Sequence, residues 1–69
     1  MDRATLARTF NLNSEADIDL VSKAYTTAEK AHAGHTRYSG EPYFSHVLIV
    51  AEELAAMGMG PRTIAAALL

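Results

Sequence analysis

Apolar residues recur at steps of three and four positions along most of this chain, which is the spacing of one face of an α-helix. The clearest stripe is Ile18, Val21, Tyr25, Ala28 and then His32. No alternation of apolar and polar residues lasts more than four positions, and thirteen alanines favour helix. The sequence therefore predicts an all-α fold.

Glycine, proline and asparagine divide this pattern into segments. Ser14 begins a capping box, because a carboxylate follows three residues later. Pro42 and Pro61 suit the first turn of a helix, where a missing N–H costs nothing, and Ser39 or Glu41 could cap the helix that begins at Pro42. About four helices are expected, covering roughly residues 2–9, 14–33, 42–57 and 61–69.

The length of 69 residues allows one domain at most, with a small core. Residues 64–69 form an apolar run, and none of the residues that usually close a helix follows it. We therefore expect the last helix to continue, and the chain to be the N-terminal part of something longer.

Composition excludes several classes of protein. The net charge is -2 and only 20% of the residues are charged, so the basic stripe of a nucleic-acid-binding protein is absent. There is no cysteine, hence no disulfide and no thiolate metal site. The chain has no apolar run long enough to span a bilayer, and its first residues do not resemble a signal peptide. We expect a soluble cytoplasmic protein that binds neither nucleic acid nor membrane.

The polar loop between the second and third expected helices is the candidate functional segment. It brings Arg37, Glu41 and His46 toward one helix start. His46 could bind a metal or act as an acid or base, or it could be an ordinary helix histidine, which spacing alone favours. No second strong ligand lies three or four residues away, and zinc-type sites need three or four ligands.

The neighbours of His46 also allow two interpretations. Arg37 could stack on a base or hold a phosphate, or it could be a solvated charge. Tyr38 could add a stacking face or only cover the loop. His32 is expected to form a hydrogen bond to the loop, and His35 to be exposed.

Taken together, the motifs resemble one known family over roughly residues 15–69. They are Ala31-His32-x-Gly34, then Arg37-x-Ser39-Gly40-Glu41-Pro42-Tyr43-x-x-His46, then the final Ala66-Ala67-Leu68-Leu69. The combination resembles the start of the RelA/SpoT-homolog family, the guanosine alarmone enzymes of the stringent response. The chain would then be a partial HD-type hydrolase domain, residues 1–69, that lacks the family's synthetase domain.

The resemblance implies a manganese-dependent enzyme that removes pyrophosphate from the 3′ position of guanosine tetra- or pentaphosphate. In the intact family member a GTP pyrophosphokinase activity can accompany it. By motif position, His46 would be the first metal ligand. Arg37 would stack on guanine, and Ser39 would lie beside it in the nucleotide pocket. Tyr38 stands where the family usually has lysine, which removes a positive charge near the nucleotide.

The family's next motif, a His-Asp pair, and a later aspartate ligand have no counterpart in these 69 residues. One histidine cannot hold manganese and activate a water. We therefore predict that the chain alone is inactive as a hydrolase.

Two other classes of protein are open. The chain could be a non-catalytic helical interaction module that self-associates through an exposed apolar face. The turn at residues 58–60 has some similarity to a helix-turn-helix. However, the helix that follows it carries only Arg62 as a charge, which suits the major groove of DNA poorly.

Overall fold

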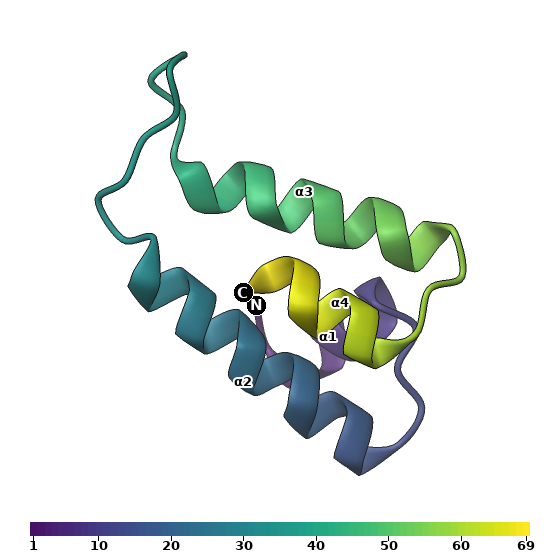
Figure 1. The fold of residues 1–69 in the computed structure, drawn as a ribbon. Coiled ribbons are helices and arrows are strands. Elements are labelled where there is room, and N and C mark those ends of the chain that lie inside the picture. The colour runs from purple at the N-terminus through teal and green to yellow at the C-terminus, as the bar shows by residue number, and fades with distance from the viewer.

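The computed structural model describes all residues 1–69 and contains four helices and no strand (Figure 1). This confirms the predicted all-α class. The helices are α1 (Arg3–Thr9), α2 (Glu15–Ala31), α3 (Tyr43–Ala56) and α4 (Pro61–Leu68). None of them combines the length and the apolar character that crossing a lipid bilayer would require.

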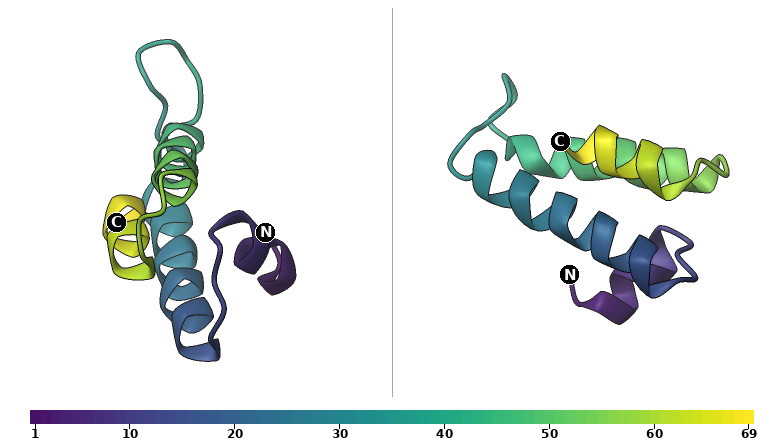
Figure 2. Two further views of the ribbon diagram at one scale, coloured as in Figure 1. Left: turned by 90° about the vertical axis from the view of Figure 1, so that its right-hand side faces the viewer. Right: turned by 60° about the horizontal axis from the view of Figure 1, so that its bottom comes forward.

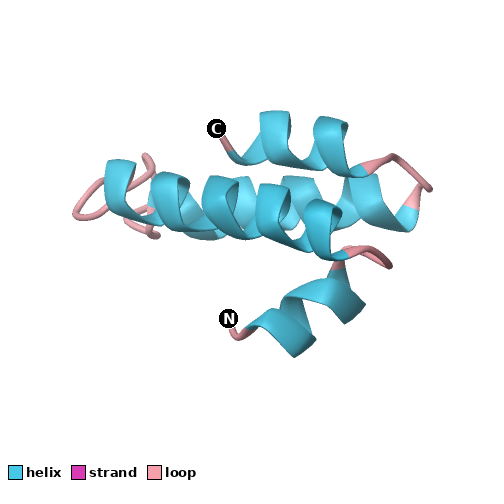
Figure 3. Ribbon diagram, turned by 90° about the horizontal axis from the view of Figure 1, so that it is seen from below, coloured by secondary structure: helices cyan, strands magenta, loops and turns pink.

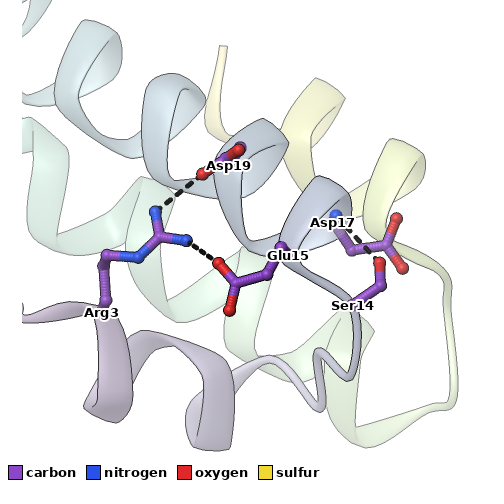
Figure 4. Close-up of polar contacts among 5 residues, drawn as sticks. All are labelled: Arg3, Ser14, Glu15, Asp17 and Asp19. Carbon is purple, nitrogen blue, oxygen red and sulfur yellow. Dashed lines mark hydrogen bonds and ion pairs between the residues drawn. The ribbon is translucent and has the colours of Figure 1, made fainter.

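The first two helices begin at side chains that accept backbone hydrogen bonds. The Asp2 carboxylate accepts the Thr5 N–H at 2.7 Å. The Ser14 hydroxyl accepts the Asp17 N–H at 3.1 Å (Figure 4). Each contact satisfies one of the N–H groups that a helix start leaves free. The predicted cap at Ser14 is therefore confirmed.

The same close-up shows how α1 is joined to α2 on the surface. The Arg3 guanidinium donates to Glu15 at 2.8 Å and to Asp19 at 2.9 Å (Figure 4). All three side chains are about half exposed or more, so solvent and salt screen these ion pairs. The pairs orient α1, but the buried contacts described next hold it.

The core lies on both sides of the α2 helix. Figures 2 and 3 show α4 on one side of α2 and α3, and α1 on the opposite side, against α2. The helix α4 packs against both α2 and α3, so it joins the two longer helices. The buried side chains are all apolar: Leu6, Phe10, Leu12, Val21, Ala24, Ala28, Ala51, Ala55, Ile64, Ala65 and Leu68.

The face that α3 buries differs from the predicted one. Steps of three and four along residues 42–57 predict an apolar stripe of Tyr43, Val47, Val50 and Leu54. Val47 does pack against the core, but the fully buried residues of α3 are Ala51 and Ala55. Tyr43 is instead exposed. Small side chains at the contact let α4 approach α3 closely, since the distance between two helices depends on the residues between them.

Three smaller expectations were also wrong. The α2 helix ends at Ala31, two residues earlier than expected. Pro42 precedes α3 instead of opening it, and no side chain caps that helix, so neither Ser39 nor Glu41 has the predicted capping role. In contrast, Pro61 does occupy the first turn of α4.

Acid should weaken the start of α1. The pKa of Asp2 lies below its ordinary value of 3.8, chiefly because the Thr5 N–H donates to the carboxylate; the Thr5 side chain and the positive charge of Arg8 lower it further. A carboxyl whose pKa is lowered by folding stabilises the fold above its unfolded value and loses that contribution as pH falls through its folded value. We expect the Thr5 amide NMR signal to report loss of the cap below pH 3.8.

The matched control is Asp2→Asn, which keeps a side-chain oxygen at the cap but does not titrate. Its Thr5 signal should change little over the same acid range. An equal acid step in this variant would mean that another group causes the change.

Candidate functional site

The loop between α2 and α3 is a short hairpin that projects beyond the helices (Figures 1 and 2). Thr36 and Pro42 form an isolated antiparallel bridge. The Arg37 N–H donates to the Glu41 carbonyl at 2.7 Å, and the Arg37 carbonyl accepts the Gly40 N–H at 2.8 Å. A three-residue hairpin loop with a left-handed glycine in third position has this bonding pattern. We call residues 36–42 the hairpin.

The conformation of Gly40 is what closes this hairpin. Its φ is +89°, a region that side chains with a Cβ rarely adopt, although no atom lies within 4 Å of where a Cβ would stand. The Gly40→Ala substitution should therefore strain the backbone without a clash, by about 1–2 kcal/mol. We expect hydrogen exchange of the Arg37 amide to accelerate about 5- to 30-fold, measured by NMR.

The control for this substitution is Ser39→Ala in the same turn. The Ser39 side chain is exposed and makes no hydrogen bond within the chain, so exchange at Arg37 should be unchanged. If Gly40→Ala exchanges no faster than Ser39→Ala, the left-handed glycine is not what holds the hairpin closed.

The three predicted nucleotide-binding residues lie together on the hairpin. Arg37, Tyr38 and Ser39 are all exposed, and Tyr38 is fully so, at 109%. None of their side chains forms a hydrogen bond, and the two ion pairs of the chain both belong to Arg3. An arginine, a phenol and a hydroxyl are thus presented without partners inside the chain.

His46 lies in the first turn of α3, directly after the hairpin, and is partly buried. Its ring meets the Tyr43 ring edge-on, with centroids 6.5 Å apart and an angle of 73°. The imidazole has no hydrogen-bond partner within the chain, so its nitrogens are not committed to a structural contact. The structure therefore leaves the ring available as a ligand or proton carrier.

His32 and His35 belong to the same aromatic group. The His32 ring lies against the Tyr43 ring, with centroids 4.9 Å apart at 34°, and His35 meets His32 edge-on at 6.0 Å. His35 is exposed, as predicted. The predicted side-chain hydrogen bond from His32 to the loop is wrong, since its ring contacts Tyr43 and only its backbone carbonyl accepts a bond, from the His35 N–H.

Sequence reasoning missed the contact between His32 and Tyr43. The two residues lie eleven positions apart in the sequence and on different helices or their ends. Helical periodicity relates residues within one helix and not across a loop. The only sequence signal for this contact was that His32 and Tyr43 flank the same polar loop.

A pocket of about 310 Å³ opens at the base of the hairpin. Its lining includes Glu29, His32, His35, Pro42 and Phe44, but none of the predicted nucleotide or metal residues. A larger pocket, of about 490 Å³, is lined by residues at the starts of α2 and α4. These helix starts lie at the end of the molecule opposite the hairpin (Figure 1). The largest pocket of the chain therefore lies at the end opposite the histidines.

Two carboxylates bring negative charge to the region between α2 and α3. The pKa of Tyr25 is raised above 10.0, first by burial and then by the negative charges of Glu29 and Glu52. The Tyr25 hydroxyl oxygen accepts a hydrogen bond from the N-terminal ammonium of Met1, at 3.4 Å. Its ring meets Phe44 edge-on at 5.2 Å.

The side chains of this chain do not by themselves form a metal site. No group of three or more histidine, cysteine, aspartate or glutamate side chains is placed to hold an ion. His46 offers one imidazole nitrogen, a donor that transition metals accept as one ligand among several.

Comparison with known proteins matches residues 24–69 to the HD domain family. Over 55 residues, the chain is 46% identical to the bifunctional (p)ppGpp synthase/hydrolase RelA of Mycobacterium tuberculosis and 47% identical to the bifunctional (p)ppGpp synthase/hydrolase SpoT of Escherichia coli. Over 56 residues it is 45% identical to the guanosine-3′,5′-bis(diphosphate) 3′-pyrophosphohydrolase of Vibrio cholerae. These matches cover 80–81% of the chain but 8% of each relative.

Proposed function

The chain belongs to the HD domain family, in its RelA/SpoT branch, and from this membership we propose that it forms the nucleotide-facing part of a (p)ppGpp 3′-pyrophosphohydrolase site. One structural observation carries the proposal. The hairpin presents Arg37, Tyr38 and Ser39 without internal partners, directly before the uncommitted imidazole of His46. A guanosine polyphosphate needs both kinds of group, a stacking and hydrogen-bonding surface for the nucleoside and a ligand for a metal at its phosphates.

Each side chain has a chemical role in this proposal. The planar Arg37 guanidinium stacks on the purine or holds a phosphate. Tyr38 adds an aromatic face, and the Ser39 hydroxyl donates to or accepts from the nucleoside. His46, as a neutral imidazole, gives one nitrogen to manganese. When bound, that metal supplies a polarised phosphoryl group and an activated water.

We assign the hydrolase activity to these residues. The names of some relatives also include a synthase activity, which we do not assign to them. The matched family is the HD domain, and it covers the hairpin and His46. The remaining ligands of the metal and any second activity belong to parts of a longer protein in this proposal.

The test is a chimera in which the matched 55 residues of the Escherichia coli relative are replaced by the corresponding residues of this chain. We expect the chimera to release pyrophosphate from guanosine tetraphosphate in the presence of manganese. The 69-residue chain alone should show no metal-dependent turnover. A chimera that folds and binds manganese but hydrolyses nothing would contradict the proposal.

One observation favours a second candidate, a self-associating interaction module. Several large apolar side chains are exposed, including Ile49, Met57, Met59 and Leu69. Exposed apolar surface can drive association of copies. Sedimentation of the chain over a range of concentrations tests this candidate, and a mass that stays at 7.4 kDa would exclude it.

A further inference from the structure

At the hairpin end of the molecule, two aromatic pairs connect α2 and its C-cap to α3. One pair is Tyr25 with Phe44, and the other is His32 with Tyr43. Backbone bonds reinforce the second pair, because the His35 N–H donates to the His32 carbonyl at 3.0 Å and the Tyr43 N–H donates to the His35 carbonyl at 2.9 Å. The first residue of α3 is thus fixed to the end of α2 through both its backbone and its ring.

His46 depends on that first residue for its surroundings. It lies three positions after Tyr43, on the same side of α3, and the Tyr43 ring is the aromatic group it contacts. Tyr43 is exposed, at 40%, so the core does not enclose its ring. The ring that lies against its face is that of His32, at 4.9 Å. The order of contacts is therefore His32, then Tyr43, then His46.

We propose that His32 is a positioning residue that sets the orientation of the His46 imidazole through the Tyr43 ring. The inference deepens the proposed function, because it concerns the same imidazole. It requires only an aromatic face at position 32 and no proton or ligand from His32. The imidazole of His32 has no side-chain hydrogen bond that would give it another role in the fold.

The test uses NMR of the 69-residue chain with labelled histidine, without metal or nucleotide. In His32→Ala, we expect the His46 ring signals to shift or broaden. Exchange of the Tyr43 amide should accelerate about 2- to 12-fold, the range that follows from the strength of one aromatic pair. The His32→Phe variant keeps a ring at the contact and should restore both signals to near their original values.

Two further variants keep the result unambiguous. His35→Ala removes the outer ring of the group and should leave His46 and the Tyr43 amide unchanged, because the bond from Tyr43 reaches only the backbone of His35. Tyr43→Leu removes the middle ring and should displace the His46 signals as His32→Ala does, because the link from His32 to His46 passes through that ring.

Two results would overturn the inference. Unchanged His46 signals in folded His32→Ala or in Tyr43→Leu would show that His46 is oriented by other contacts. Failure of His32→Phe to restore the signals would show that the imidazole, and not the stacked face, matters at position 32. Neither result depends on nucleotide hydrolysis, so the inference and the proposed function can fail separately.

Discussion

Replacing His46 with alanine in the Escherichia coli chimera is expected to lower manganese-dependent hydrolysis of guanosine tetraphosphate by about 100-fold or more. Loss of an outer partner of a metal ligand already costs 10–100-fold in affinity or activity, so loss of the ligand itself should cost at least as much. Manganese affinity should fall in parallel. Calorimetric titration of the metal and a pyrophosphate-release assay measure the two effects.

His35→Ala is the matched control for this prediction. It also removes an imidazole near the hairpin, but His35 is exposed and follows α2 instead of lying on α3. Its activity and metal affinity should stay close to those of the unchanged chimera. If His46→Ala retains the affinity of the unchanged chimera for manganese, His46 is a structural histidine and the proposed metal role is wrong.

The second large effect is on stability. Ile64 is fully buried in α4, the helix that packs against both α2 and α3. Ile64→Ala should cost about 2–5 kcal/mol, because it removes apolar contacts and leaves a cavity. A chain of this size is stable by only about 3–10 kcal/mol. We therefore expect the unfolding midpoint to fall by at least about 8 °C, or the cooperative transition to disappear, in circular dichroism.

Ile49→Ala is the same chemical change on α3, where the side chain is 52% exposed. It should alter the free energy of unfolding by no more than about 0.5 kcal/mol. Both positions lie inside a helix, so alanine raises the helix propensity equally in the two variants. Equal losses at the two sites would mean that the contacts of Ile64 do not stabilise the fold more than those of an exposed isoleucine.

The sequence predicted the number and order of the helices because their start signals are local. Ser14 caps its helix by accepting a hydrogen bond from the N–H three residues later. Pro61 favours a helix start through the geometry of its own ring. The buried face of α3 was not predictable in the same way. Large apolar residues dominate a periodicity pattern, whereas Ala51 and Ala55 are buried because another helix lies close to them.

The site was predicted in part, and for different reasons. The family resemblance predicted functional roles for Arg37, Ser39 and His46, and these roles stay predictions. The hairpin itself was expected only as a loop, because its register depends on the backbone bonds of Arg37 and on the left-handed Gly40. The contact of His32 with Tyr43 is tertiary, so no local rule could provide it.

The position of α4 in the chain order affects how the protein is made. Ile64 and Leu68 lie at the contact of α4 with the two longer helices, yet they are synthesised after both of them. A nascent chain that has emerged from the ribosome only as far as α3 still exposes the apolar surfaces of α2 and α3 that α4 later covers. Until Pro61–Leu68 emerges, such a chain should depend on chaperones for protection against aggregation.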